Sequence, residues 1–194
     1  WIDLYLNGSY NGIYLLTETV TVADGRVDIY NLEKENRQYN AELENARHYE
    51  EERRKGYLLD HVKTIDGGYL IEKDLWEYYE EEPVGFEIPS GYRFSIKEPA
   101  HASKEQVDYI ADYVEGIDRM VQERDPAVWE VLDLDSLVQA FLVDEITLET
   151  DVAATSMYFY KDVGDKTLYI GPVWDYEHTF GERNVDVLEG KFVN

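Results

Sequence analysis

Residues 147–181 read TLETDVAATSMYFYKDVGDKTLYIGPVWDYEHTFG, and this stretch decides the fold because it predicts a β-hairpin. Residues 156–161 and 167–174 are rich in Tyr, Phe, Ile and Val, which favour strands. Gly164 and Asp165 lie between these segments and supply turn chemistry. We therefore predict that the two segments pair as an antiparallel hairpin.

Carboxylates flank the predicted hairpin. Asp151 comes just before it, and Asp175 and Glu177 come just after its second strand. An antiparallel pair brings its two ends together, so we expect these side chains to lie close to one another. If residues 175–177 stay extended, alternate side chains share a face, and both carboxylates can meet one cation. The pattern predicts a site for a cation.

The spacing of these residues matches a known catalytic arrangement. Protein kinases carry a catalytic-loop Asp, a metal-binding residue five positions later, a hairpin, and then a second metal-binding Asp. Here Ser156 lies five positions after Asp151, and the hairpin leads to Asp175. The alternative is that Asp151 turns a loop while Asp175 and Glu177 are solvated, in a chain with 42 Asp and Glu residues among 194.

Four segments stand out for their residue identities. In chain order they are LNGSYNGIYLLTE at 6–18, GGYLIEKD at 67–74, DEITLETD at 144–151 and GPVWDYEHTFG at 171–181. Together they resemble the spore coat protein H (CotH) kinase family. The resemblance implies an α+β, two-lobed protein-kinase-like fold in a single domain. It also implies a kinase that uses ATP and Mg2+ or Mn2+, with Ca2+ as an alternative metal, to phosphorylate Ser or Thr of other proteins.

The family likeness also implies roles for individual residues. Asp151 would orient the acceptor hydroxyl, and Asp175 would be the metal ligand under the phosphates. Ser156 departs from the usual kinase pattern, which has Asn there, but a hydroxyl can ligate magnesium as it does in phosphate-binding loops. Family members carry further strands before the first motif and further helices after the last, so we expect the domain to be incomplete at both ends. They are secreted, so we expect an extracellular or cell-surface location.

Composition limits the classes of function. The chain has 194 residues, of which 44% are hydrophobic, so it can bury a core as one domain or a two-lobed one. Its net charge of -24 opposes binding to nucleic acid and to anionic membranes. The net negative charge also repels an anionic nucleotide. Because the Debye length at physiological salt is only about 8 Å, a metal ion inside a cleft can still outweigh the distant charges. The sequence contains no run of 18 apolar residues, so it does not predict membrane insertion. It contains no Cys, which excludes disulfides.

The first hundred residues predict a strand-rich lobe. Residues 1–18 alternate as a hairpin with Asn-Gly turns, and Glu18 at its end is a candidate contact for a nucleotide or a metal, although such an acid is more often solvated. Residues 31–66 are dense in Glu, Arg, Asn and Lys, which predicts an exposed helical insertion stabilised by pairs such as Glu33 with Arg37. We expect this insertion to be the most mobile or protruding part.

A candidate phosphate-binding cation lies at the end of this lobe. Residues 92–97 predict a strand that ends with Lys97, where a kinase-like site needs a positive charge. Glu72, inside the strand predicted from GGYLIEKD, is the expected acidic partner of Lys97. The alternative is that Lys97 is an ordinary residue of an edge strand.

The apolar periodicity becomes helical after residue 100. Ser103 and Gln106 form a capping box before an amphipathic helix that ends near Pro126. A second helix, starting at Asp135, is apolar on most of its circumference, so we expect it to be central to its lobe. The predicted division of the domain is therefore a strand-rich lobe over residues 1–100, with the helical insertion, and a helical lobe over residues 101–194 that holds the hairpin at 156–174.

Two classes of function fit these observations. In a metal-dependent phosphotransferase, Asp175 with Ser156 and Glu177 holds the metal, Lys97 neutralises phosphate and Asp151 orients the hydroxyl. The alternative is a non-catalytic binding or scaffold module that retains the kinase-like fold, for example in a multidomain cell-surface or polysaccharide-degrading assembly of the cellulosome type. Three features favour this alternative: Ser156 stands in place of Asn, the sequence lacks a clear phosphate-cradling glycine loop, and the net charge is strongly negative.

Overall fold

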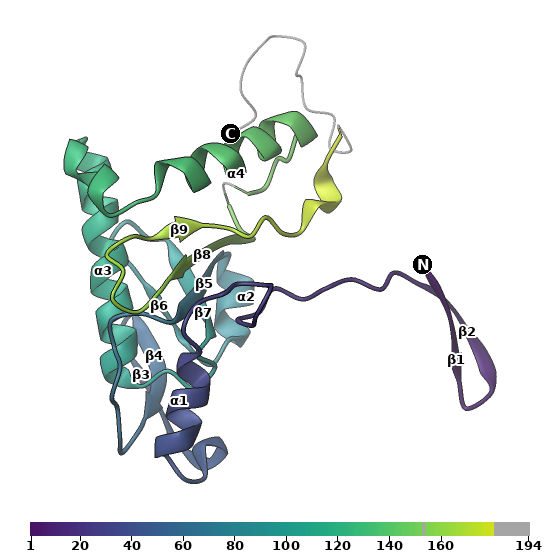
Figure 1. Ribbon diagram of the computed structural model, residues 1–194, viewed down its shortest axis with the longest axis horizontal. Helices are drawn as coiled ribbons and strands as arrows, with labels where there is room; N and C mark the ends of the chain where they lie inside the picture. Colours follow the sequence, from purple (N-terminus) through teal and green to yellow (C-terminus); the bar gives the residue numbers. More distant parts are fainter. Residues whose placement is uncertain (153, 181–194) are drawn as a thin grey trace.

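Antiparallel strands and helices alternate along the chain in the computed structural model, which describes residues 1–152 and 154–180 (Figure 1). Within these residues, one sheet has seven strands in the order β3-β4-β6-β7-β5-β8-β9. They are β3 (Arg47–Glu51), β4 (Arg54–Leu58), β5 (Tyr69–Asp74), β6 (Gly85–Glu87), β7 (Arg93–Glu98), β8 (Met157–Lys161) and β9 (Tyr169–Ile170). The α+β class is therefore as expected. Because β8 and β9 extend the same sheet, the strands are not confined to residues 1–100.

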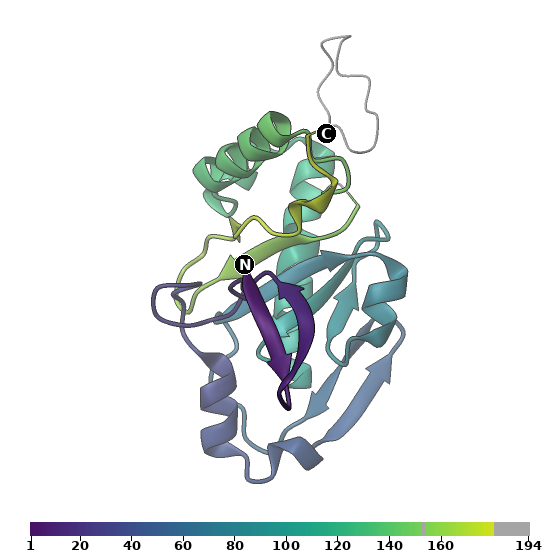
Figure 2. The ribbon, with the colours of Figure 1, turned by 90° about the vertical axis from the view of Figure 1, so that its right-hand side faces the viewer.

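Helix α3 (Lys104–Glu123) covers one face of the sheet (Figure 2). The predicted capping box is present, since the Ser103 side chain accepts from the Gln106 N–H and the Gln106 side chain accepts from the Ser103 N–H. The helix buries a stripe of apolar residues against alternate residues of the central strands. The resulting core includes Val107, Ile110, Ala111 and Val114 of α3 together with Tyr69, Ile71, Phe86, Phe94 and Ile96 of the sheet.

The opposite face of the sheet is covered by other elements. Leu70 of β5 and Tyr158 of β8 pack with Val22 and Val27 from the segment that precedes helix α1. The short helix α2 (Trp76–Glu81) contacts β7 on the side away from α3 (Figure 1). Because side chains alternate between the faces of a strand, Glu72 also projects toward this second face.

The hairpin predicted for residues 156–174 is confirmed. Strand β8 pairs with β9 so that Phe159 lies opposite Ile170 and Tyr160 lies opposite Tyr169. The turn uses Gly164 at a φ of +72°, a left-handed conformation that glycine adopts readily. The regular pairing is shorter than predicted, and the chain continues from β9 to Asp175 without regular secondary structure.

The prediction of an exposed helical insertion over residues 31–66 is wrong for most of its length. Only α1 (Leu32–Tyr39) and the 3-10 turn η1 (Leu43–Asn45) are helical, and β3 and β4 follow as a hairpin of the main sheet. The predicted Glu33–Arg37 pair is present at 2.8 Å. Leu32 is buried in the core, and the buried Asn36 amide bonds the Gln106 side chain. The segment is thus part of the body.

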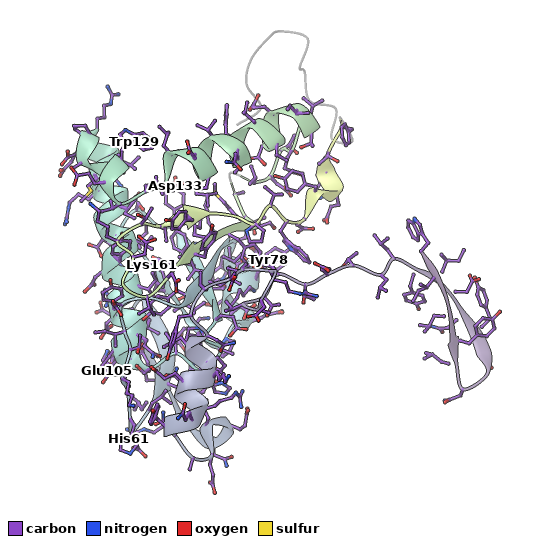
Figure 3. All side chains as sticks on the ribbon, in the orientation of Figure 1. His61, Tyr78, Glu105, Trp129, Asp133 and Lys161 are labelled. Atoms are coloured by element: carbon purple, nitrogen blue, oxygen red, sulfur yellow. The ribbon has the colours of Figure 1, made fainter. Side chains whose placement is uncertain are left out.

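Among the described residues, the part that projects is the N-terminal hairpin. Its strands are β1 (Ile2–Leu6) and β2 (Ser9–Tyr14), joined at Asn7 and Gly8 as predicted. They form a separate two-stranded sheet at the end of an extended connection, and their side chains stand clear of the body (Figure 3).

Helix α4 (Leu134–Thr147) follows the 3-10 turn η2 (Pro126–Glu130) and contacts β9. Its expected central position is wrong for the described residues, because only Ala140 and Asp144 of the helix are buried. One apolar stripe is exposed and consists of Leu134, Val138, Leu142 and Ile146. In the described part of the chain, no helix combines the length and the apolar character that crossing a membrane requires.

Candidate functional site

The two ends of the predicted hairpin meet at Ser156 and Asp175. The Ser156 hydroxyl donates to Asp175 Oδ2 over 3.1 Å. Both residues have left-handed backbone conformations, with φ of +60° and +66°. Such conformations are uncommon for residues other than glycine, and they concentrate at sites where the surrounding structure enforces them. The structure therefore brings together two of the predicted metal-site residues.

Glu177 and His178 extend this contact to Asp151. Both lie in the 3-10 turn η3 (Tyr176–His178), so residues 175–177 are turned rather than extended as we had assumed. A hydrogen-bonding contact with the Asp175 carboxyl group raises the pKa of Glu177, and the charges of Asp175 and Asp151 raise this pKa further. His178 Nε2 lies 3.9 Å from Asp151 Oδ2 and 3.6 Å from Glu177 Oε1. The side chains of Asp151, Ser156, Asp175, Glu177 and His178 form one group, which we call the acidic cluster.

The segment that carries Asp175 is anchored to α4. The Tyr176 hydroxyl donates to the carboxylate of Asp144, which is buried in α4. Burial raises the pKa of Asp144, and the bond from Tyr176 opposes this shift. The N–H of Phe180 donates to the carbonyl oxygen of Thr147 at 2.6 Å. These contacts fix the turn η3 on both sides of Glu177.

Glu149 belongs to the surroundings of Asp151 and was missed in the sequence analysis. Its side chain is buried, and Oε1 accepts from the N–H groups of Thr150 and Asp151 at 2.7 and 3.1 Å. His178 was not among the predicted site residues either, although it follows Glu177 directly in the sequence. No sequence signal identifies either residue, since both contacts depend on how the loop folds back.

A second charged group surrounds Lys97 on β7. Lys97 Nζ lies 3.0 Å from Glu72 Oε2 on the neighbouring strand β5, which is the partner that the sequence predicted. It also lies 2.5 Å from Glu82 Oε1, just after α2, and this second partner was not predicted. Burial lowers the pKa of Lys97, but the bonds and charges of Glu82 and Glu72 outweigh burial and raise it. Lys97 is therefore a charged residue held between two carboxylates.

Strand β8 connects the two groups. Tyr158 lies two residues after Ser156 and directly opposite Glu72 of β5 in the sheet. Ser156 and Tyr158 also line one small hollow together with Asp144 and Trp174. The same strand thus leads from the acidic cluster to the residue that pairs with Glu72, the partner of Lys97.

Glu18 belongs to neither group. Its side chain is largely exposed and lies 3.9 Å from Arg26. It lines a separate groove that Arg26 and Trp174 also border. The structure thus does not bring Glu18 to Lys97 or to the acidic cluster.

The donor set of the acidic cluster suits a hard cation. Among residues 1–152 and 154–180, no three His, Cys, Asp or Glu side chains form a ready-made metal cage. Mg2+ in nucleotide sites is usually held by one or two carboxylates together with phosphates and water. The adjoining carboxyl groups of Asp175 and Glu177, with the Ser156 hydroxyl, fit that incomplete type of site.

The fold and the site define an α+β protein with an acidic, oxygen-lined candidate site at the ends of one hairpin. The chain matches the family model described as CotH kinase protein over residues 1–193. It therefore belongs to the CotH kinase family, as its motifs had indicated. Neither the curated proteins nor the solved structures include a match to this chain.

Proposed function

We propose that this chain is an ATP- and metal-dependent phosphotransferase that acts on Ser or Thr of protein substrates and has the two-lobed arrangement of kinases. Family membership supports a kinase-like function. The observation that carries the proposal is the acidic cluster, in which Asp175 bonds Ser156 while Asp151 lies next to His178. Kinase catalysis depends mainly on positioning and on neutralising charge, and these residues suit both tasks.

Each residue has a distinct role in this proposal. Asp175, with Ser156 and Glu177, would hold Mg2+ or Mn2+. A bound cation of this kind supplies charge neutralisation at the phosphates. Lys97 contacts a phosphate oxygen while Glu72 holds its ammonium group in place. Asp151 accepts a hydrogen bond from the acceptor hydroxyl and orients it.

The proposed roles of Asp175 and Asp151 are separable by experiment. Titration of the full chain with ATP, with and without Mg2+ or Mn2+, measures metal-dependent binding. Asp175→Ala should lower the affinity for metal-bound ATP by at least about tenfold. Asp151→Ala should leave that affinity unchanged and remove phosphoryl transfer to a Ser-containing model protein such as casein. Glu81→Ala, which removes an exposed acid elsewhere, is the matched control.

Two results would contradict the proposal. If Asp175→Ala binds metal-bound ATP as well as the wild type does, the metal is held elsewhere. If the wild type binds no nucleotide with either metal, the phosphotransferase function is wrong.

A non-catalytic scaffold module is the second candidate. The observation that favours it is the pairing of Lys97 with both Glu72 and Glu82, which leaves the ammonium group little free charge for a phosphate. Such a module would bind another protein at the cell surface or outside the cell. It would show the fold and cation binding of the first candidate without nucleotide binding.

A further inference from the structure

Glu149 lies in the loop between α4 and Asp151 and is only 1% exposed. Glu side chains are almost never fully buried unless they are paired. Its Oε1 accepts from the N–H of Thr150 at 2.7 Å and from the N–H of Asp151 at 3.1 Å. The carbonyl oxygen of Asp151 accepts in turn from the N–H groups of Ala154 and Thr155 at 2.7 and 3.0 Å. Both the N–H group and the carbonyl oxygen of Asp151 are therefore held by hydrogen bonds. Glu149 accepts the bond from the N–H group.

The second carboxyl oxygen of Glu149 has no such role in the main chain. Oε2 is buried and has no hydrogen-bond partner among the described residues. The side chain of Asp151 is within hydrogen-bonding contact of the Glu149 carboxyl group. Burial, followed by this contact, raises the pKa of Glu149. A buried carboxyl oxygen without a partner is unfavourable, whereas a carboxylic acid facing the Asp151 carboxylate satisfies both groups.

Among the described residues, groups of the turn η3 also approach this pair. His178 approaches Asp151 from η3, and the charge of Glu149 also acts on Tyr176 in the same turn. Tyr176 is itself bonded to Asp144 on α4. The turn η3, which is bonded to α4 through Tyr176, therefore reaches the Asp151 side chain through His178.

We propose that Glu149 is a positioning residue for Asp151, holding both its main chain and its carboxyl group in the orientation that an acceptor hydroxyl requires. This inference rests on the proposed phosphotransferase function. Glu149 itself touches neither nucleotide nor acceptor. Its loss should therefore change turnover without changing nucleotide affinity.

Two substitutions separate positioning from simple packing. Glu149→Gln keeps an oxygen for the two N–H groups and offers an N–H2 group to Asp151. Glu149→Leu has a similar size and removes both kinds of hydrogen bond. Thr150→Val is the matched control in the same loop, because the buried Thr150 hydroxyl has no hydrogen-bond partner among the described residues.

Phosphoryl transfer from ATP to casein and the binding of metal-bound ATP are measured for all three variants. A small misplacement of a catalytic group lowers turnover by on the order of 10²-fold, and we expect this loss for Glu149→Leu with unchanged nucleotide affinity. Glu149→Gln and Thr150→Val should stay close to the wild type. Equal losses for the Gln and Leu variants would overturn the inference, as would full turnover of the Leu variant.

Amide hydrogen exchange tests the inference without relying on activity. The N–H groups of Thr150 and Asp151 should lose protection in Glu149→Leu and keep it in Glu149→Gln. Unchanged exchange in Glu149→Leu would overturn the inference even in an active enzyme. If the wild type transfers no phosphate while exchange behaves as expected, Glu149 does hold the loop, but the proposed function and the catalytic purpose of this contact both fail.

Discussion

Lys161 offers the sharpest test of how the hairpin is held in place. It lies on β8 in the body of the molecule next to α3 and is 1% exposed (Figure 3). Its ammonium group donates to the carbonyl oxygens of Asp66 and Asp165, with a longer contact to that of Asp162 at 3.5 Å. It also lies over the rings of two tyrosines of α3. One charge therefore links the turn before β5 to the turn of the hairpin.

We expect Lys161→Met to destabilise the fold by up to about 3 kcal/mol, because two close charged hydrogen bonds are lost at roughly 1.5 kcal/mol each. Met keeps most of the buried apolar stem, so the loss of packing is small. Burial lowers the pKa of Lys161, which means that removing the charge also relieves a desolvation penalty and offsets part of the loss. For a domain of this size, 3 kcal/mol corresponds to a fall in Tm of roughly 6–12 °C.

Urea denaturation of Lys161→Met and of Lys166→Met measures this effect. Lys166 lies in the same hairpin but is exposed and pairs with Glu130 at 3.8 Å, so its loss should change stability by less than about 0.5 kcal/mol. Equal stabilities for the two variants would show that the carbonyl contacts of Lys161 do not hold the hairpin, and the reasoning would be refuted.

Three further outcomes follow from other parts of the structure. Chymotrypsin should cut first at the exposed Tyr14, Leu15 and Leu16, between the projecting hairpin and the body, and first cleavage within residues 31–66 would contradict the fold. Gly68→Ala should destabilise the fold, because the backbone there has a φ of +83° and a Cβ would lie 2.7 Å from a carbonyl oxygen. Gly116→Ala, in open space on α3, should stabilise the fold by about 0.5–1 kcal/mol. Thermal melting of the two variants measures both effects. Burial raises the pKa of Glu72 in the folded state above its ordinary value of 4.5. The protonated side chain therefore stabilises the fold fully below pH 4.5, and this stabilisation is lost as the pH rises through the folded-state pKa. Glu72→Gln should consequently gain stability relative to the wild type between pH 4 and pH 8, and a constant difference in urea midpoint would argue against this.

Local signals in the sequence were enough for several elements. The capping box at Ser103 and the apolar stripe that follows it identified α3, since both depend only on neighbours within a helix. Turn residues between β-rich segments identified the hairpins β1–β2 and β8–β9. These elements are determined by contacts close in sequence.

Elements that depend on distant contacts were not predictable in this way. The segment with β3 and β4 looks like a solvated helix by composition, but Lys55 is buried, with its ammonium group over the Tyr79 ring and bonded to the Tyr79 carbonyl oxygen. Gly56 lies against the backbone of Ala102, which leaves no room for a larger residue. Helix α4 shows the opposite case: its apolar composition predicted a central position, but most of its residues are not buried. The composition of a helix does not reveal which neighbours cover it. In each case the partner is far away in the sequence.

The candidate site shows the same division. The contact of Ser156 with Asp175 could be anticipated, because a hairpin brings its own ends together. Glu149 and Glu82 could not be found, since their importance comes from burial and from folding back onto Asp151 and Lys97. Spacing can identify which residues meet, whereas the residues that hold them in place require the three-dimensional structure.

The negative charge around the proposed site should make ATP binding dependent on a divalent metal. Lys97 is the cation nearest the phosphates in the proposed arrangement, and two carboxylates already contact it. The acidic cluster at the start of β8 adds further negative charge, in a chain whose net charge is -24. A triphosphate without a cation would meet repulsion from both groups, and at this range salt screens only part of it. If the chain binds ATP, that binding should therefore depend completely on a divalent metal, and measurable binding in excess EDTA would place the nucleotide away from these residues.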